Sequence, residues 1–260
     1  MGVLNLTPDS FYDGNRYNSE KTILEQVGKM LEAGATFIDL GAYSSKPHAA
    51  LVSEEEEGQR LLPILKCIVK EFQNVVISID TFRSGIARQS LDLGAAMIND
   101  ISAGLMDEKM MQVIADYKVP YVMMHMRGTP QTMATHTEYD NLIKEMIYYF
   151  SERTAKARSL GINDLIIDPG FGFAKTLDQN YELLGNLELL HHLDLPILVG
   201  LSRKSMVYKL LKSNPDDALN GTTVLHTFAL SKGASILRVH DVKEAMECVV
   251  LCEKLKSKDQ

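Results

Sequence analysis

The sequence has few cysteines and no long apolar run. Its 3 cysteines, Cys67, Cys248 and Cys252, are odd in number and have no metal-like spacing, which argues against a disulfide framework and favours a reducing, cytoplasmic setting. No apolar stretch approaches the roughly 20 residues of a membrane-spanning helix. Met1 leads directly into a strand-like segment, so we expect no signal peptide.

An excess of positive charge is also missing. The net charge of -7 argues against general nucleic-acid binding. It does not exclude a small anionic substrate, because such a site needs only a few local cations. The sequence shows no interdomain linker and no low-complexity tract. We therefore expect the 260 residues to form a single domain, 1–260.

Strand-like and helix-like segments alternate along the chain. The strand candidates are 1–6, 36–41, 75–80, 95–100, 120–125, 165–168, 197–201 and 235–240. Helical patterns cover 22–32, 53–70 (with capping-box spacing of Ser53 and Glu56) and 138–160, and a last helix begins near Asp241. Gly34, Gly94 and Gly233 suit left-handed helix ends. Eight such units predict an α/β fold, a (β/α)₈ TIM barrel. A doubly wound sheet is the alternative, although it rarely needs eight evenly spaced units.

Polar residues follow nearly every predicted strand. They are Asn5, Asp39, Asp80, Asn99, Asp100, His125, Asp168, Arg238 and His240, with Ser202, Arg203 and Lys204 after the seventh strand. In a barrel these strand ends converge on one face, where active sites lie. Any single aspartate there is more often a helix cap, but capping alone explains the whole set poorly.

The segment 165–176 combines several of these signals. An apolar run ends in Asp168, and Pro169 with two glycines then forces the backbone to turn. Phe173 and Lys175 follow in the turn. A carboxylate at the end of a buried strand, with an aromatic ring and a cation beyond it, indicates a binding site more than a core.

Seven segments resemble the motifs of one known family and together span nearly the whole chain. They are Met1-Gly2-Val3-Leu4-Asn5-Leu6-Thr7-Pro8-Asp9-Ser10-Phe11, Ile79-Asp80-Thr81, Ile98-Asn99-Asp100, Met124-His125-Met126, Asp168-Pro169-Gly170-Phe171-Gly172-Phe173, Gly200-Leu201-Ser202-Arg203-Lys204-Ser205 and Arg238-Val239-His240-Asp241. The chain resembles the dihydropteroate synthases. That resemblance implies a transferase of folate biosynthesis, which condenses 6-hydroxymethyl-7,8-dihydropterin pyrophosphate with p-aminobenzoate and releases pyrophosphate. It also implies a Mg²⁺ cofactor, inhibition by sulfonamides and a homodimer.

The resemblance further implies three sub-sites. The pterin sub-site is expected to contain Asp80, Asn99, Met124, Asp168, Phe173 and Lys204, although Met124 is equally well explained by core packing. The pyrophosphate sub-site is expected to contain Asn5, Ser45, Arg238 and His240, with Asn5 near the metal. The p-aminobenzoate sub-site is expected to contain Phe11, Lys46, Pro47, Phe173 and Ser202. The catalytic set implied is Asp13, Lys46, Lys204, Arg238 and His240.

The segment 42–48 resembles the second of the two loops that the family places around p-aminobenzoate, and it departs from the usual pattern. Lys46 replaces an arginine and so lacks its bidentate fork, and His48 replaces a glycine.

Two other classes of protein stay open. A corrinoid methyltransferase pterin domain usually works beside a cobalamin domain, which we do not expect in this chain. A non-catalytic pterin-binding protein would lose the anion and loop residues, whereas this sequence retains both sets.

Overall fold

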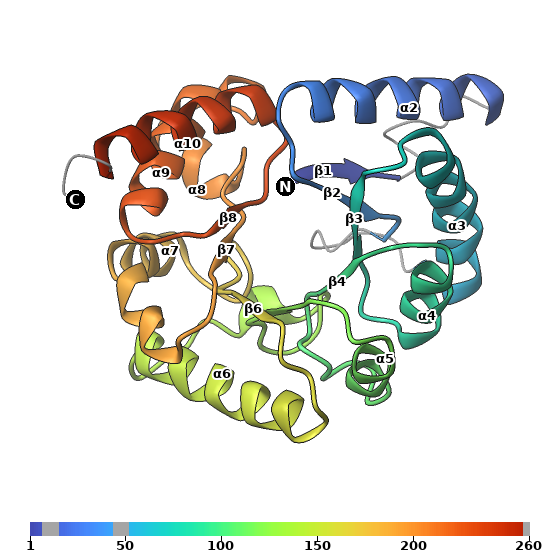
Figure 1. The fold of residues 1–260 in the computed structure, drawn as a ribbon. Coiled ribbons are helices and arrows are strands. Elements are labelled where there is room, and N and C mark those ends of the chain that lie inside the picture. The colour runs from blue at the N-terminus through green and yellow to red at the C-terminus, as the bar shows by residue number, and fades with distance from the viewer. Residues whose placement is uncertain (7–15, 44–51, 257–260) are drawn as a thin grey trace.

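Eight parallel strands form a barrel at the centre of the molecule (Figure 1). The computed structural model describes residues 1–6, 16–43 and 52–256. The strands are β1 Gly2–Asn5, β2 Phe37–Gly41, β3 Val76–Asp80, β4 Met97–Asp100, β5 Tyr121–Met124, β6 Leu165–Asp168, β7 Leu198–Val199 and β8 Ile236–Leu237. The predicted barrel is therefore confirmed, and the doubly wound alternative is wrong.

The barrel closes through two narrow contacts. Strands β1 to β6 pair in sequence order, and β7 pairs with β8. A parallel bridge between Ile167 and Ile197 joins β6 to β7, and a second between Gly2 and Val239 joins β8 to β1. The N–H of Val3 donates to Val239 O at 2.9 Å, so the last strand returns to the first. Closure removes the free sheet edges and gathers all carboxyl ends of the strands at one end.

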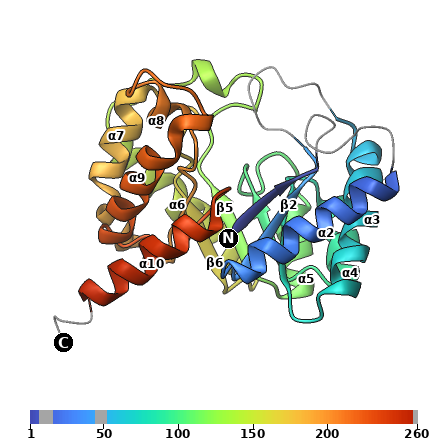
Figure 2. The same ribbon diagram turned by 90° about the horizontal axis from the view of Figure 1, so that it is seen from above.

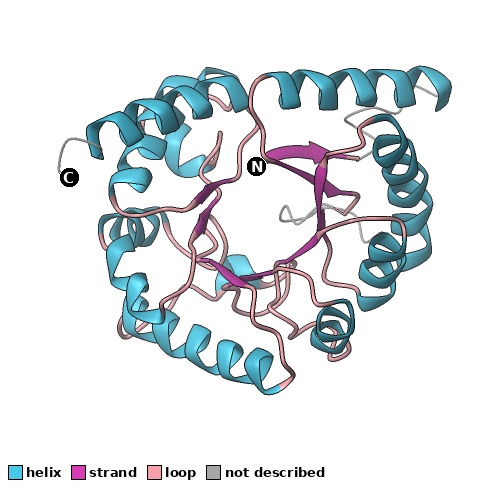
Figure 3. Ribbon diagram, in the orientation of Figure 1, coloured by secondary structure: helices cyan, strands magenta, loops and turns pink. Residues whose placement is uncertain are grey.

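Helices surround the strands on all sides, as the view coloured by secondary structure shows (Figure 3). They are α2 Arg16–Glu32, α3 Glu54–Glu71, α4 Ser84–Asp92, α5 Met110–Tyr117, α6 Leu142–Ser159, α7 Leu177–Gly185, α8 Ser205–Tyr208, α9 Leu219–Ser231 and α10 Val242–Lys256, with short 3₁₀ segments η1 Met133–Thr135, η2 Leu187–Leu193 and η3 Asp216–Ala218. From the side, α2 to α4 cover one flank and α7 to α9 the opposite one (Figure 2). Among the described residues, no helix has the length and apolar character needed to cross a bilayer.

Local sequence signals explain most helix ends. Gly34, Gly94 and Gly233 have φ of 97°, 100° and 90°, which confirms the predicted left-handed helix ends. Ser53 accepts the N–H of Glu56 at 3.1 Å, but the Glu56 carboxylate pairs with Arg60, so the predicted capping box is only half formed.

The helix predicted over 138–160 begins later than its apolar pattern suggested. Asn141 is the N-cap of α6, and its side chain accepts the N–H of Lys144 at 2.9 Å. Tyr139 therefore lies outside the helix, and its hydroxyl donates to Ala174 O at 2.9 Å. At this end the N-cap residue Asn141, and not the spacing of the apolar residues, determines where the helix begins.

The barrel interior is filled at its amino-terminal end. Met97, Val122, Ile166 and Leu198 come from β4 to β7 and pack together inside. Because side chains alternate along a strand, the residues two positions later on β4, β5 and β6 also point inward. Those residues are Asn99, Met124 and Asp168, so alternation places them above the apolar layer, at the carboxyl end.

Candidate active site

Arg238, directly after β8, joins a carboxylate in the middle of β2 to the carboxylate that ends β3. Its Nε donates to Asp39 Oδ2 at 2.6 Å and its Nη2 to Asp80 Oδ2 at 2.7 Å. Asn99 Nδ2 donates to the same Asp39 oxygen at 3.2 Å. Asp39 is fully buried, and its Oδ1 has no hydrogen-bond partner in the described part of the chain. Residues of β2, β3 and β4 and the residue after β8 thus meet in one polar cluster.

The pKa values of Arg238 and Asp80 depend on burial and on the neighbouring charges in this cluster. Burial works against the Arg238 cation, but the carboxylates of Asp39 and Asp80 outweigh it and raise the pKa of Arg238 above its usual value. Burial raises the pKa of Asp80 to about 7, although Arg238 opposes this shift. The charged form of Asp80 therefore depends on its contact with Arg238.

Asp168 ends β6 and is buried beside further cations. Its Oδ1 accepts the N–H of Gly170 at 2.7 Å, which closes the turn after the strand. Burial raises the pKa of Asp168, whereas Lys204, the Gly170 N–H, Arg238 and Lys175 all lower it. Gly170 has φ of 69°, and a Cβ there would lie 2.5 Å from His125 O, so only glycine fits this turn.

Lys204 and two apolar side chains lie beside Asp168. The Lys204 ammonium donates to Phe171 O and lies 4.6 Å from the centroid of the Phe173 ring. Burial lowers the pKa of Lys204 to about 8, with Asp168 opposing the shift. Met124 is buried in an apolar cluster against which Phe173 packs. A flat, polar-edged ring would find carboxylates and an amide for its edge, and sulfur and aromatic surfaces for its faces.

Ser202 and His240 link the loops after β7 and β8. The Ser202 Oγ accepts the backbone N–H of His240 at 3.2 Å and lies 3.0 Å from His240 Nδ1. Burial, followed by the charge of Arg238, lowers the pKa of His240, so its ring is neutral near pH 7. Arg238, Lys204 and His240 together provide cationic and N–H groups suited to an anion.

Comparisons with known proteins agree with this arrangement. The model of a family described as "Pterin binding enzyme" matches residues 1–240. Dihydropteroate synthase of Escherichia coli (strain K12) is 44% identical over 255 residues, covering 97% of this chain and 90% of that protein. The chain belongs to the dihydropteroate synthase family.

Solved structures of the family superimpose closely on the chain. The Yersinia pestis dihydropteroate synthase in a sulfonamide drug complex has a TM-score of 0.92 at 41% identity, covering 99% of this chain and 94% of that one. The Thermus thermophilus dihydropteroate synthase in complex with 4-aminobenzoate has a TM-score of 0.88 at 38% identity, covering 98% and 93%. The protein is accordingly an enzyme of folate biosynthesis, a transferase.

The structure brings together most of the described residues predicted for a dihydropteroate synthase site. Arg238, Asp80 and Asn99 share the polar cluster around Asp39, and Ser202 contacts His240. Asn5 ends β1, where its side chain is exposed. The predicted residues Phe11, Asp13, Ser45, Lys46 and Pro47 lie outside the described residues. The sub-site assigned to each residue by resemblance stays a prediction.

Two polar residues at strand ends, Asp100 and His125, point away from this site. Asp100 accepts hydrogen bonds from Ser102 and from the Tyr121 hydroxyl at 2.6 Å, and so supports the loop after β4. His125 packs edge-on against Tyr149, outside the barrel. The expectation that every strand-end polar residue lines one site is wrong for these side chains, because adjacent residues of a strand point to opposite faces.

Two site residues were not among those assigned from the sequence. Asp39 was noted only as a strand end, yet it accepts hydrogen bonds from both Arg238 and Asn99. Asp39 lies in the middle of β2, opposite Ser78 of β3, and a carboxylate within an otherwise apolar buried strand was the available signal. Lys175 was noted in its turn without a role, and the structure buries it.

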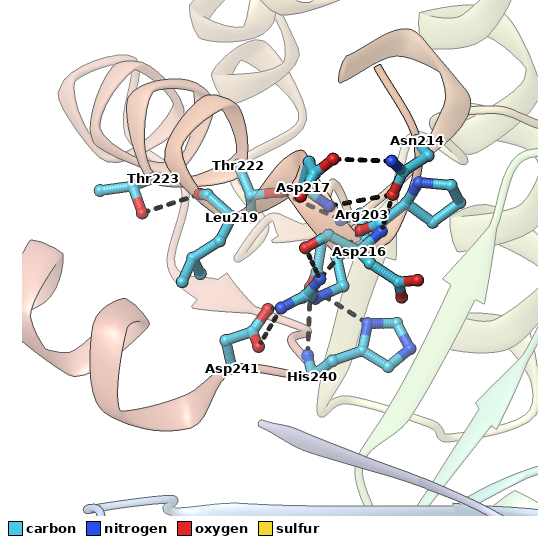
Figure 4. Close-up of polar contacts among 11 residues, drawn as sticks. Arg203, Asn214, Asp216, Asp217, Leu219, Thr222, Thr223, His240 and Asp241 are labelled. Atoms are coloured by element: carbon cyan, nitrogen blue, oxygen red, sulfur yellow. Dashed lines mark hydrogen bonds and ion pairs between the residues drawn. The ribbon is translucent and has the colours of Figure 1, made fainter. Parts of the chain in front are cut away.

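Arg203, in the loop after β7, also points away from the site and joins this loop to the loop after β8 (Figure 4). Its guanidinium forks onto the Asp241 carboxylate, with Nε–Oδ2 and Nη2–Oδ1 both at 2.9 Å. Its Nη1 donates to Pro215 O at 2.9 Å and to Asp216 O at 2.8 Å. The neighbours of this pair in sequence, Ser202, Lys204 and His240, face the site, so the pair fixes the two loops relative to each other.

We expect Arg203→Met and Asp241→Asn each to lower the free energy of unfolding by about 1.5–3 kcal/mol, the range for hydrogen bonds to charged groups. In the double variant the free energy of unfolding should fall by clearly less than the sum of the two single losses, because both substitutions remove the same interaction. Urea denaturation measures all three. Lys243→Met is the control, since Lys243 pairs with Glu247 at 4.0 Å on an exposed helix face and should matter little. Strictly additive losses would contradict the coupling.

Proposed function

We propose that the protein condenses 6-hydroxymethyl-7,8-dihydropterin pyrophosphate with p-aminobenzoate (4-aminobenzoate) to form 7,8-dihydropteroate and pyrophosphate. The observation that supports this best is the polar cluster itself. Asp80, Asn99 and Asp168 offer carboxylate and amide groups for the edge of a pterin, directly beside the cations Arg238 and Lys204. A pterin pyrophosphate combines the two matching features, a donor-rich ring edge and an anion.

The reaction needs stabilisation of a departing anion more than a nucleophilic side chain. In the proposed step the bond between the pterin methylene carbon and the pyrophosphate oxygen breaks, and its electron pair leaves with pyrophosphate. The amine nitrogen of p-aminobenzoate then bonds to that carbon and releases a proton. Arg238, Lys204 and His240 would stabilise the growing negative charge on the leaving oxygen. Ser202, which was predicted to meet the p-aminobenzoate carboxylate, is buried against His240.

We further propose Mg²⁺ as the cofactor, with Asn5 among its ligands. Mg²⁺ is usually held by one or two protein oxygens together with substrate phosphates and water. The exposed Asn5 side chain at the end of β1 fits that pattern. Among the described residues no group of three or more His, Cys, Asp or Glu side chains could hold a metal, so substrate oxygens would complete the set. When bound, the ion would neutralise charge on the pyrophosphate.

The direct test is an activity assay. Purified protein is mixed with the pterin pyrophosphate, p-aminobenzoate and Mg²⁺, and dihydropteroate is sought by mass spectrometry. Formation of dihydropteroate together with an equal amount of pyrophosphate supports the proposal. Pterin binding without product would favour a non-catalytic pterin-binding protein, and transfer of a methyl group to a corrinoid would favour a methyltransferase.

Binding of p-aminobenzoate is expected to depend on the other ligands. This substrate is small and has one carboxylate, whereas ordering a site costs about 1–2 kcal/mol for each residue fixed. Its affinity should therefore be low for the free enzyme and much higher with pyrophosphate and Mg²⁺ present. Calorimetric titrations with both partners, with either alone and with neither measure this dependence. Equal affinities in all titrations would show a preformed site.

We also propose a cytoplasmic homodimer. Cys67, Cys248 and Cys252 form no disulfide, which suits a reducing compartment. The helices α9 and α10 and the residues after α8 expose apolar side chains, namely Leu210, Leu211, Val224, Phe228, Val250, Leu251 and Leu255. By contrast, Val242 and Ala245 of α10 are buried in the core. Light scattering with Phe228→Glu as a comparison tests whether this surface joins two copies.

A further inference from the structure

Lys175 is a buried lysine whose ammonium group bonds to no carboxylate in the described part of the chain. It follows β6, with a residue exposure of 8%. Its Nζ donates to Gly170 O at 3.0 Å and to Phe173 O at 3.0 Å, and lies 3.2 Å from His125 Nδ1. These three acceptors match the three N–H donors of an ammonium group. Such a set forms a fixed binding place for one cation inside the turn.

His125 anchors the same turn in two further ways. Its N–H donates to Asp168 O at 2.9 Å, which extends the pairing of β5 with β6 to the end of both strands. Its carbonyl oxygen lies 2.5 Å from the position that a Cβ on Gly170 would occupy. Because Gly170 donates its N–H to Asp168 and accepts from Lys175, one peptide residue connects the carboxylate to the cation. His125 therefore acts on the turn, although it faces away from the site.

We propose that Lys175 is a positioning residue for the pterin site, which fixes the turn between Asp168 and Phe173 and adds its charge to the surroundings of the Asp168 carboxylate. The inference rests on the proposed function, because it assigns Asp168 to the edge of the pterin. Lys175 does not touch the ring in this argument. It acts through the Gly170 and Phe173 carbonyls and through its charge.

The charges around the pair are consistent with this role. The cations that face Asp168 are Lys204, Arg238 and Lys175, and each lowers the pKa that burial raises. Burial disfavours the charged form of Lys175 and lowers its pKa to about 7, and the Asp168 carboxylate opposes that shift. Burial, with the charges of Lys175 and Arg127, lowers the pKa of His125 well below its usual value. A neutral His125 leaves Nδ1 free to accept from Lys175.

The test compares affinity for 6-hydroxymethyl-7,8-dihydropterin pyrophosphate in the wild type and Lys175→Met, by calorimetry from about pH 6 to pH 8.5. Without the Lys175 cation the pKa of Asp168 should rise, so its carboxylate protonates at a higher pH. We expect the ratio of the two affinities to widen as the pH falls, with the acid limb of the variant displaced to higher pH, because one of the cations that lower the pKa of Asp168 is gone. Ionisation of the ligand is common to both proteins and cancels in the ratio.

Tyr139→Phe is the matched control. It removes a neutral hydrogen bond to Ala174 O, in the same turn, at 2.9 Å. Any loss of affinity in this variant should be the same at each pH. A constant ratio between wild type and Lys175→Met would likewise mean a purely structural lysine and would overturn the charge role.

A second variant covers a failure of Lys175→Met to fold. His125→Leu removes one acceptor from the ammonium group, which should lower the Lys175 pKa further and move the acid limb in the same direction by a smaller amount. An unchanged acid limb in His125→Leu would overturn the proposal. Failure of the wild type itself to bind the pterin pyrophosphate at any pH would instead remove the proposed function.

Discussion

Replacing Arg238 with methionine is expected to lower the free energy of unfolding by about 3–5 kcal/mol, the range for breaking a buried ion pair from one side. The reason is the position of Asp39, which is fully buried and accepts from Arg238 at 2.6 Å. The variant would keep that carboxylate without its cation. It should also lose turnover, because Arg238 is one of the cations proposed for the leaving pyrophosphate.

A second substitution separates the two effects. Arg238→Met combined with Asp39→Asn removes both the cation and the buried charge that it compensates. We expect the double variant to recover a large part of the stability in urea denaturation and to remain inactive. If the single variant were as stable as the wild type, Arg238 would not be the partner that holds Asp39 in the fold.

The loss should also depend on pH. Burial raises the pKa of Asp80 to about 7 in the fold, above its usual value of 3.8, and Arg238 opposes that rise. A raised carboxyl pKa means that the folded state binds the proton more tightly, so this group favours folding at acidic pH and opposes it above the folded pKa. Without Arg238 the pKa should rise further. The stability difference between Arg238→Met and the wild type should therefore be smaller near pH 5.5 than near pH 8.

The barrel was predictable because its signals are local and repeated. Eight apolar runs, nearly all of them followed by a polar residue, recur along the chain with helical patterns between several of them, and each needs only its own sequence to be recognised. The boundaries were less accurate for the last strands. The predicted 197–201 and 235–240 became Leu198–Val199 and Ile236–Leu237. In the loop after β7, Arg203 has φ of 53°, a left-handed conformation that the apolar pattern does not encode.

The site was only partly predictable, for a geometric reason. Alternation decides which of two adjacent polar residues faces inward, and it separates Asn99 from Asp100 once the strand's register is known. That register follows from Met97, whose place inside the barrel depends on contacts with other strands. The pairing of Arg238 with Asp39 joins residues 199 positions apart, and no local pattern encodes such a contact.

The two strand-end aspartates on β6 and β4 give the sharpest test of the assignment. Asp168→Asn keeps an acceptor for the Gly170 N–H but removes the charge proposed to bind the pterin edge. We expect the affinity for the pterin pyrophosphate to fall by about 1.5–3 kcal/mol, roughly 10- to 150-fold, while the protein stays folded. Calorimetry of the purified variant, with its thermal unfolding recorded beside it, measures both quantities.

Asp100→Asn should show the opposite pattern. Asp100 points away from the site and accepts from Ser102 N, Ser102 Oγ and Gly104 N at 2.7 Å each, and from the Tyr121 hydroxyl at 2.6 Å. An amide has one oxygen for these four donors, so the folded state should lose at least about 1.5–3 kcal/mol. Pterin affinity of the folded protein should change little. If Asp100→Asn weakened pterin binding and Asp168→Asn did not, the inward and outward assignments on these strands would have to be exchanged.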